Sequence, residues 1–522
     1  MFDWLTFITL FPIIGVIILF FIPKNNSTVI KNIALVVSLV NFLFSLVLLV
    51  GFKPVSSMQF EVNKVWIKNL GINYHIGIDG ISIFIVLLTT FLTPIVILSA
   101  YNVLRDPKYK DKAKEYMGLL LLLETAVIGA LISLDLILFY LFWEMMLIPM
   151  YFLIGIFGGE KRTYAALKFF IYTMAGSIMM LVAMFILYMN AGAVSFDLAY
   201  IISHVHLSTT EQSLLFLAFF VAFAVKVPMF PLHTWLPDAH VQAPTGGSVI
   251  LAGVLLKMGT YGFIRFAIPL FPNVAVSYAG VIGIFAVIGI IYGALVAMVQ
   301  KDVKKLVAYS SISHLGFVVL GIFAFTNTSM TGAIYQMLNH GISTGALFLL
   351  VGIIYERRHT KEIKEFGGLT KVMPLYAVIF LIATLSSIAL PLTNGFVGEF
   401  LILSGTYISR TMQWSSILTI LATTGVIFGA GYMLWMFKRV MFGPLTNEKN
   451  KNLKDLNLRE FTYLFPLIVM VFVMGVFPNF FLRRIEPTVN SFLENNINNR
   501  VYSKTNKKVA LKITKNQRRS KR

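Results

Sequence analysis

Apolar runs of 18 or more residues follow one another along almost the whole chain, and this feature restricts the fold most strongly. As a helix, a run of this length crosses the hydrocarbon core of a bilayer, which is about 30 Å thick. The chain of 522 residues is 57% hydrophobic and 13% charged, whereas a soluble protein carries about 25% charged residues. The sequence therefore predicts an all-α polytopic membrane protein.

About 14 transmembrane helices are predicted. Their approximate ranges are 4–23, 32–51, 80–103, 116–133, 136–158, 166–189, 213–232, 246–268, 276–298, 304–325, 331–354, 373–408, 414–437 and 461–481. The first run contains an acidic residue and no basic stretch, which predicts a retained span and not a cleaved signal peptide.

Two of the predicted spans carry signals for a break. The seventh has Pro228 and Pro231 near its end, beside Lys226, and the twelfth has Pro391 and Asn394-Gly395 in its middle. Proline removes a backbone donor and opens the hydrogen-bond ladder of a helix. Discontinuous helices 7 and 12, five spans apart, are typical of transporters built from repeats, with sites at the breaks.

Five-helix repeats contain an odd number of spans, so two such repeats in succession are inverted relative to each other. The predicted parts are an N-terminal three-helix region at 1–115, a first repeat at 116–272, a second, inverted repeat at 273–440, a loop and last span at 441–482, and a basic, flexible tail at 483–522.

The net charge of +20 is placed unevenly. Lys and Arg around the loops after spans 1, 3, 5, 9, 11 and 13 number 24, against five on the opposite side, so these loops are predicted to face the cytoplasm or matrix. Residues after Leu482 contain 12 basic and two acidic side chains. This tail is interpreted as a solvated end, or as a segment that binds acidic lipid headgroups or a partner. The distribution does not favour nucleic-acid binding.

The chain has no cysteine, which excludes disulfides, thiolate metal sites and iron–sulfur ligation in it. It also lacks Walker, dinucleotide-binding and flavin motifs, so a redox cofactor has to lie elsewhere. His233, Asp238 and His240 follow the seventh span, but their spacing matches no strong metal motif. A structured loop is predicted there.

Seven ionisable side chains lie deep inside predicted spans, more than three residues from either end. They are Glu124, Glu144, Lys226, Lys257, His314, His340 and Glu399. Roughly 2.5–3.5 kcal/mol is the insertion cost of a single Asp, Lys or Arg at the centre of a helix. A fixed ion pair that joins two helices accounts for one Glu and one Lys, but not for seven groups on seven spans. The set is typical of a proton relay.

The residue types suit proton transfer. Burial favours the neutral amine of a lysine, and a nearby carboxylate favours the ammonium, so moving an acid switches a buried lysine between the two forms. Arginine is unable to release its proton, and both cations deep in the apolar spans are lysines, Lys226 and Lys257. Histidine titrates near neutral pH and is a natural intermediate. The break after Lys226 exposes backbone carbonyls and gives room for water beside it.

Several motifs resemble one family closely. They are "HIGIDGISIFIVLLTTFLTP", "FYLFWEMMLIPMYFLIGIFGG", "FAVKVPMFPLHTWLPDAHVQAPTGGSVILAGVLLKMGTYGFIRFAIPLFP", "QKDVKKLVAYSSISHLGF" and "NGFVGEF". Over roughly residues 1–482 the chain is similar to the subunit 4 family, called subunit M in bacteria, of antiporter-like membrane subunits of NADH:ubiquinone oxidoreductase, respiratory complex I. The resemblance implies a fourteen-helix proton-translocating unit with two inverted five-helix repeats.

The resemblance also implies roles for the intramembrane residues. Glu144 would pair with Lys226, and Lys257 would be the central lysine, followed by His314 and His340 and by Glu399 as the terminal group toward the outer side. Glu124 and Asp79 match family positions with less settled roles. Neighbouring antiporter-like subunits would flank the chain in the bilayer, and NADH, FMN, iron–sulfur clusters and ubiquinone would be bound by other subunits.

Alternatives to this interpretation remain. One is a subunit of an Mrp-type Na⁺(K⁺)/H⁺ antiporter, although such subunits usually place Lys at the twelfth-span break, where this chain has Glu399. Another is a membrane anchor with an inert polar axis. The abundance of Ile, Phe, Asn and Lys favours the mitochondrial inner membrane, with the bacterial cytoplasmic membrane as the alternative.

Overall fold

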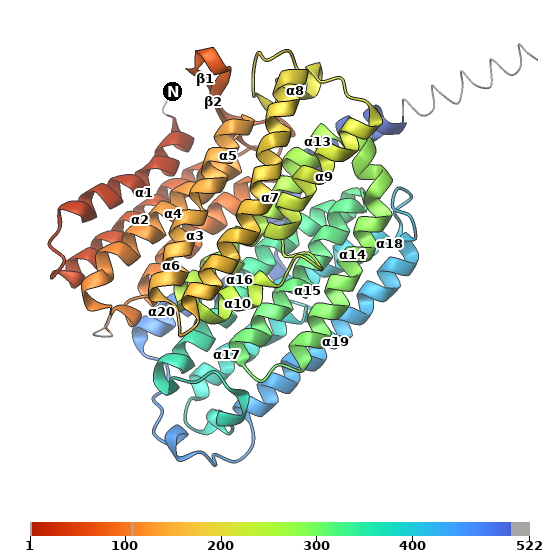
Figure 1. Cartoon of the computed structure of the whole chain (residues 1–522). Helices are drawn as coiled ribbons and strands as arrows, with labels where there is room; N and C mark the ends of the chain where they lie inside the picture. Colours follow the sequence, from red (N-terminus) through yellow and green to blue (C-terminus); the bar gives the residue numbers. More distant parts are fainter. Residues whose placement is uncertain (1–2, 106–108, 503–522) are drawn as a thin grey trace, which may run out of the picture.

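The computed structural model describes residues 3–105 and 109–502, which form a bundle of long helices (Figure 1). The first part comprises α1 (Trp4–Phe21), α2 (Ser27–Gly51), β1 (Gln59–Ile67), β2 (Ile72–Ile78), α3 (Ile83–Ser99), α4 (Ala113–Ile132), α5 (Leu136–Met145), α6 (Leu147–Phe157), α7 (Arg162–Asn190) and α8 (Leu198–His204). The middle part comprises α9 (Thr209–Lys226), α10 (Trp235–Gln242), α11 (Thr245–Ile250), α12 (Leu256–Gly262), α13 (Ile268–Leu270) and α14 (Pro272–Met298). The last part comprises α15 (Val303–Phe323), α16 (Asn327–Arg358), α17 (Pro374–Ser387), α18 (Asn394–Tyr407), α19 (Ser415–Met441), α20 (Leu458–Val476) and α21 (Asn479–Leu493).

The predicted polytopic helical architecture is confirmed. In the described part of the chain, 12 helices are long and apolar enough to cross a membrane, and α3 and α17 are shorter apolar helices. The number of 14 spans and the division into two inverted repeats stay predictions.

Three helical segments form the centre of the bundle. Each long helix has a most apolar stretch of 18 residues. In α16 and in the continuous segment Thr245–Leu270 all residues of this stretch are buried, and in α15 94% of them are buried. The corresponding share is 33% in α1 and in α2. In Figure 1, α1 and α2 lie along one edge of the molecule and α19 along the opposite edge. The central segments are therefore shielded from lipid, and the peripheral helices cover them.

Both predicted breaks are present. Helix α9 ends at Lys226 and α10 begins at Trp235, while α17 ends at Ser387 and α18 begins at Asn394. The seventh span had been expected to continue to residue 232. It ends earlier because Pro228 and Pro231 supply no backbone donor for a further turn.

New partners satisfy the backbone groups beside the breaks. The indole Nε1 of Trp235 donates to the carbonyl of Val225 (2.9 Å), just before the end of α9. At the other break, the hydroxyl of Thr393 donates to the backbone carbonyl of Leu390 (2.6 Å). Such partners are required because an unpaired backbone group is expensive in a membrane interior.

A two-stranded antiparallel hairpin, β1 and β2, was not expected from the sequence. Its register pairs Val62 with Ile76 and Ile67 with Ile72. The local signal is the β-branched and aromatic residues that recur through 59–78 around Gly71, which lies in the left-handed region (φ 63°). The apolar runs on both sides dominate the composition and hide this short signal.

The prediction of a flexible tail from residue 483 is wrong for residues 483–502. Helix α21 continues to Leu493, and a π-helical segment, η9, follows at Glu494–Tyr502. The reason is an apolar stripe, because Phe481, Ile485 and Val489 are buried at helical spacing. The hydroxyl of Thr488 also accepts from the backbone N–H of Gly80 (3.1 Å). The rest of the predicted tail, 503–522, lies outside the described residues.

The hairpin is joined to the bundle by a charged cluster at His75. Its Nε2 lies 2.8 Å from Glu61 Oε1, and its Nδ1 makes a short contact with Asp197 Oδ2. Burial opposes a charge on His75, but the hydrogen bonds to Asp197 and Glu61 outweigh it and raise the pKa of the imidazole. Burial also opposes the charge on Asp197, but His75 and backbone N–H groups outweigh it and lower the pKa of this carboxyl. The charged forms of His75 and Asp197 therefore stabilise each other as an ion pair.

This cluster predicts a pH dependence of hairpin stability. Because the pKa of His75 is raised in the folded state, protonated His75 stabilises the folded hairpin fully below its unfolded pKa of about 6.5. This stabilisation is lost as pH rises through the folded pKa. The lowered pKa of Asp197 preserves the pair until the solution is much more acidic. Hydrogen–deuterium exchange of β1 and β2, corrected for intrinsic exchange, should therefore accelerate above neutral pH. His75→Gln should abolish this dependence and His206→Gln, at an exposed site, should keep it; an unchanged pH profile in His75→Gln contradicts the assignment.

Candidate functional site: a buried polar axis

Four of the predicted site residues form a line through the centre of the bundle. Lys257 Nζ lies 2.7 Å from His340 Nδ1, the rings of His340 and His314 are 5.8 Å apart between centroids, and His314 Nδ1 lies 3.1 Å from Glu399 Oε1. The four residues come from α12, α16, α15 and α18. All four are at least 90% shielded from solvent. The structure thus brings together groups that are up to 142 positions apart in the sequence.

Lys257 is held by an irregular helix. The segment Leu251–Leu255 before it and Phe263–Ala267 after it are π-helical. The ammonium group donates to the carbonyl of Ala252, five residues earlier, in a short hydrogen bond. Single π turns occur often at functional sites, because they change the direction of a side chain and loosen the backbone ladder. No sequence feature predicts these two turns.

Side-chain amides and a hydroxyl support the acidic end of the line. Gln336 Nε2 donates to Glu399 Oε1 (3.2 Å), and Asn339 Nδ2 donates to Gln336 Oε1 (2.9 Å). The hydroxyl of Ser387, the last residue of α17, lies 3.3 Å from His314 Nε2. The break between α17 and α18 thus places polar groups beside the histidine. Sequence reasoning did not single out Gln336 or Ser387.

Lys226 and Glu144 lie near each other without a direct bond. Lys226 is 1% exposed, and its Nζ has no hydrogen-bond partner among the described residues. The amine lies 5.0 Å from the ring centroid of Trp143 and 5.8 Å from that of Phe169. The charges of Lys226 and Glu144 are close enough to interact, and Glu144 Oε1 also has no hydrogen-bond partner among the described residues. Cation–π contacts stabilise a desolvated ammonium, so the amine is held among aromatic rings, near an acid whose own hydrogen bonds go to Ser177 and Tyr140.

Glu144 stands at a kink that the sequence analysis did not predict. The predicted fifth span is interrupted between α5 and α6, at Met146. Pro149 follows, and a proline removes a donor and clashes with the carbonyl four residues before it. Glu144 therefore lies in a loosened turn, as Lys226 and Lys257 do.

A close helix contact joins the two lysine regions. A Cβ atom at Gly259 on α12 would lie 2.7 Å from the carbonyl oxygen of Phe223 and 2.6 Å from Val227 Cγ2. Glycine thus lets α12 approach the end of α9, as small residues do in membrane bundles. Lys226 and Lys257 lie on either side of this contact.

His240, which the sequence analysis assigned to a structured loop, is a further buried histidine. The residue lies in helix α10, is fully buried, and stacks on Phe348 with 4.6 Å between ring centroids. Both of its ring nitrogens lack a hydrogen-bond partner among the described residues. The charges of Lys304 and Lys257 both act on the ring. An unsatisfied buried imidazole is costly, which makes His240 a functional candidate; its position just after a helix break was the available signal.

Its two sequence neighbours have structural roles. Asp238 accepts from Lys168 Nζ (2.7 Å), and His233 lies between the rings of Phe230 and Tyr292. Among residues 3–105 and 109–502, no group of three or more His, Asp or Glu side chains is arranged to hold a metal ion.

Glu124 does not join the axis. It is buried in α4, where Glu124 Oε1 accepts from Asn41 Nδ2 of α2 (2.9 Å). The side chain thus faces the N-terminal helices, and its hydrogen-bond partner is Asn41 and not Lys226.

Asp79 forms a buried ion pair with Arg265. Arg265 Nη2 donates to Asp79 Oδ1 (2.6 Å) and Nε donates to the hydroxyl of Tyr261 (3.1 Å). Asp79 Oδ1 also accepts from the backbone N–H of Ile81 (3.0 Å) before α3. This pair ties the hairpin and α3 to the central helix.

Two family models match the chain, and together they cover most of it. The model described as "NADH:quinone oxidoreductase/Mrp antiporter, TM" matches residues 133–429. The model described as "NADH-ubiquinone oxidoreductase chain 4, amino terminus" matches residues 7–130.

Similar proteins cover nearly the whole chain. NADH-quinone oxidoreductase subunit M of Rhodobacter capsulatus is 47% identical and covers 94% of this chain and 96% of its own length. NADH-ubiquinone oxidoreductase chain 4 of Marchantia polymorpha is 43% identical, with 93% and 96% covered.

Solved structures agree with this result. A chain of respiratory complex I from Thermus thermophilus with bound NADH has a TM-score of 0.84 and 32% identity, with 94% of this chain and 99% of that chain covered. A chain of the Mrp complex from Dietzia sp. has a TM-score of 0.78 at 22% identity, with 94% and 52% covered, and therefore shares the fold.

The Asp79–Arg265 pair predicts a specific stability pattern. Asp79→Asn leaves the buried guanidinium uncompensated and should destabilise the chain by about 3–5 kcal/mol. Adding Arg265→Met removes that charge, so the double variant should be less destabilised than the sum of the single variants. Thermal unfolding of the purified assembly measures both. The exposed pair Glu448–Lys451 is the control, with Glu448→Gln costing about 1 kcal/mol or less; additivity in the Asp79–Arg265 cycle refutes the pairing.

Proposed function

The chain belongs to the family of NADH:quinone oxidoreductase subunit M and chain 4, the antiporter-like membrane subunits of respiratory complex I, and we propose that it moves protons along the axis from Glu144 to Glu399. It is thus part of a proton-translocating NADH:quinone oxidoreductase. Electron transfer from NADH to quinone belongs to other subunits, and this chain supplies a membrane path for protons.

The observation that carries the proposed path is the contact series Lys257–His340–His314–Glu399. Neighbouring members are separated by 2.7 Å, by a ring-to-ring distance of 5.8 Å, and by 3.1 Å. Each member accepts and releases a proton without other covalent change, and the first and last pairs lie within the hydrogen-bond distances over which general acid–base groups act. A structural ion pair does not need four titratable groups from four helices.

The first half of the path is a loading site. When Glu144 approaches Lys226, the carboxylate favours the ammonium form, and when it withdraws, the buried amine releases its proton. No hydrogen bond joins the two groups: Lys226 Nζ and Glu144 Oε1 are unpartnered among the described residues, and the Glu144 carboxyl is hydrogen-bonded to Ser177 and Tyr140 and not to the amine. The kink at Met146 and the break after Lys226 leave both backbones free to adjust.

The released proton passes to Lys257 and then to the histidines. His340 Nδ1 accepts from the Lys257 ammonium, and His314 transfers to the Glu399 carboxylate, which delivers the proton toward the outer side. The loss of proton affinity at Lys226, when the acid moves away, is the step that performs work. Charge movement in the rest of the assembly drives that step.

Partners and location are proposed from the family. Antiporter-like subunits flank the chain on both sides in the bilayer, and NADH, FMN, iron–sulfur clusters and ubiquinone are held by other subunits. The composition favours the mitochondrial inner membrane, whereas the curated relatives named subunit M favour the bacterial cytoplasmic membrane. Co-purification of a peripheral NADH-oxidising arm tests the assignment of partners, and cell fractionation tests the location.

A redox-independent Na⁺/H⁺ antiporter is the second candidate, since one matching family model includes Mrp antiporters. Sodium-dependent pH exchange by vesicles that lack the NADH-oxidising arm supports this alternative. The proposed function requires that proton movement in such vesicles depend on NADH oxidation and not on a sodium gradient.

Replacing Lys226 provides the functional test. In the intact complex, Lys226→Ala should lower NADH-driven proton pumping by about tenfold or more, because a lost proton-transfer group costs 10²–10⁴-fold in a rate it controls. Glu144→Gln should have an effect in the same direction. Lys449→Ala, in the loop between α19 and α20, is the matched control with pumping retained. A normal proton-to-electron ratio in the double variant Glu144→Gln, Lys226→Ala makes the axis inert and overturns the proposal.

A further inference from the structure

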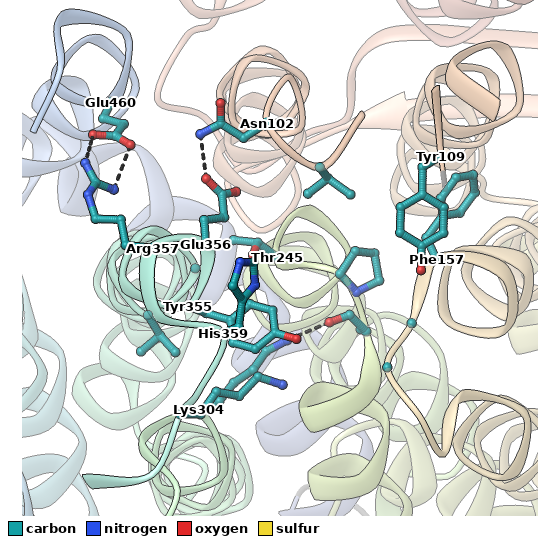
Figure 2. A pocket seen from close by; sticks show the side chains of 18 of the residues that line it. Asn102, Tyr109, Phe157, Thr245, Lys304, Tyr355, Glu356, Arg357, His359 and Glu460 are labelled. Carbon is teal, nitrogen blue, oxygen red and sulfur yellow. Dashed lines mark hydrogen bonds and ion pairs between the residues drawn. The ribbon is translucent and has the colours of Figure 1, made fainter. Parts of the chain in front are cut away.

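A large cavity opens between helix ends on the side of the basic loops. Its volume is about 1500 Å³, and residues from the connections after α3, α6, α10, α16 and α19 line it, together with Lys304 at the start of α15. These connections follow predicted spans 3, 5, 7, 11 and 13, so the cavity faces the predicted cytoplasmic or matrix side. We call it the inner vestibule; Figure 2 shows Lys304, Tyr355 and His359 from its lining, with Tyr109 and Phe157 across from them.

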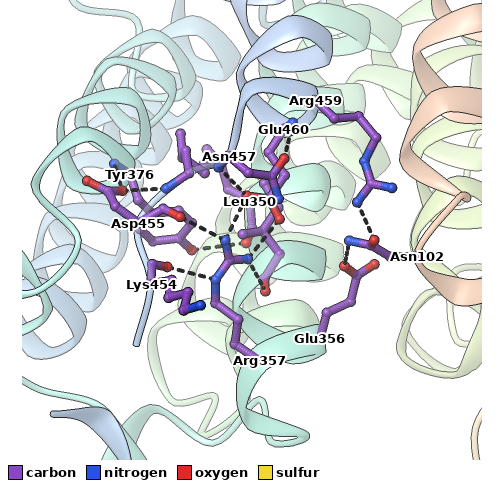
Figure 3. Close-up of polar contacts among 12 residues, drawn as sticks. Asn102, Leu350, Glu356, Arg357, Tyr376, Lys454, Asp455, Asn457, Arg459 and Glu460 are labelled. Carbon is purple, nitrogen blue, oxygen red and sulfur yellow. Dashed lines mark hydrogen bonds and ion pairs between the residues drawn. The ribbon is translucent and has the colours of Figure 1, made fainter. Parts of the chain in front are cut away.

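One wall of the vestibule is fixed by paired charges. Arg357 at the end of α16 makes two hydrogen bonds to Glu460 on α20 (2.9 and 2.7 Å) and one to the carbonyl of Lys454 (2.9 Å), as Figure 3 shows. Glu356 accepts from Asn102 Nδ2 (2.5 Å), and Asn102 in turn accepts from Arg459. These charges have partners and hold the wall in place.

Lys304 differs from the wall residues. It lines the vestibule, is 5% exposed, and donates to the carbonyl oxygen of Ala243 (2.6 Å). Among the described residues no carboxylate lies within ion-pair distance of its amine, and the nearby Asp302 caps α15 by accepting from the backbone N–H of Lys305 (2.9 Å). A nearly buried amine without an acid exchanges its proton more readily than a paired one.

Beyond Lys304 lies an imidazole that the axis leaves unpartnered. Ala243 follows α10, and His240, three residues before it, is fully buried with both nitrogens unsatisfied among the described residues. The ring stacks on Phe348 of α16 (4.6 Å between centroids), about two turns after His340, whose Nδ1 contacts Lys257 Nζ. Lys304, His240 and Lys257 therefore form a sequence from the vestibule to the middle of the axis.

We propose that the inner vestibule is a proton uptake site in its own right and that Lys304 passes protons from it through His240 to Lys257. The inference rests on the proposed function of the axis. A solvent proton binds the neutral Lys304 amine, the resulting ammonium gives it to a ring nitrogen of His240, and the imidazolium gives it to the amine of Lys257. Each step moves one proton and no electrons, so no further reactant is needed.

A purely structural role for Lys304 makes a different prediction. Lys361 Nζ donates to the carbonyl of Val241 (2.9 Å), so two amines bind the end of α10, where cations are favourable. If Lys304 only binds this end of α10, the variant Lys304→Arg should function normally, because arginine retains the charge and the hydrogen-bond donors. If Lys304 transfers protons, arginine fails, because it does not release its proton.

Access to the vestibule is measurable without reference to pumping. Because the chain has no cysteine, Thr245→Cys introduces a single thiol on the cavity lining. In sealed vesicles of the intact complex, a membrane-impermeant methanethiosulfonate added on the side of the basic loops should modify this thiol, as mass spectrometry of the chain detects. Ser248→Cys, fully buried one turn further along, should remain unmodified. Equal labelling of both sites, or labelling of Thr245→Cys from the opposite side only, overturns the vestibule assignment.

The role of Lys304 is tested by NADH-driven pumping in the intact complex. Lys304→Met and Lys304→Arg should both lower pumping by about tenfold, while the adjacent Lys305→Met, which is outside the cavity lining, should leave it unchanged. Rescue by Lys304→Arg shows a structural role and overturns the proposal. Normal pumping in both Lys304 variants, combined with loss in Lys226→Ala, refutes the uptake site and leaves the axis intact. Loss of pumping in both Lys304 variants, combined with normal pumping in Lys226→Ala, refutes loading at Lys226 instead.

Discussion

The structure depends on a buried amine that has a base, and not an acid, as its nearest partner. Lys257 lies in a helix that is wholly inside the protein, and it contacts one backbone carbonyl and one imidazole. In a low-dielectric interior an ammonium without a counter-ion is unstable, so its proton has a strong tendency to leave. His340 is the acceptor within reach. This arrangement accounts for the order of groups from Lys257 to Glu399, which begins with a strained donor and ends with a carboxylate.

Irregular helices make such an arrangement possible. Lys226 stands at the end of α9, Glu144 at a kink, Lys257 between two π turns, and Glu399 in the first turns after the break before α18. Each irregularity places loosened backbone next to an ionisable group, as the membrane-protein fold allows only where the backbone is enclosed by protein. The peripheral helices α1, α2 and α19 carry none of the axis residues, whereas His314 and His340 come from the uninterrupted central helices α15 and α16.

The sequence predicts those parts that composition controls. Long apolar runs determine the membrane helices, prolines mark the breaks after Lys226 and before Asn394, and ionisable residues inside apolar runs identify the axis residues. Features controlled by packing were missed. The π turns around Lys257 have no sequence signature, and the role of His240 depends on which rings surround it. Lys304 follows a loop, and this position predicts a residue at the membrane surface. Only the fold shows that its side chain is nearly buried. The helix beyond residue 483 was hidden by its basic composition.

The central claim is that Lys257 releases its proton during turnover. Proton pumping per NADH oxidised, measured in proteoliposomes of the intact complex with Lys257→Arg, tests it most directly, because arginine retains the positive charge and holds its proton. The account predicts that the ratio falls as far as it does in Lys257→Ala. An unchanged ratio in Lys257→Arg would contradict it, since a fixed charge at that position would then be sufficient.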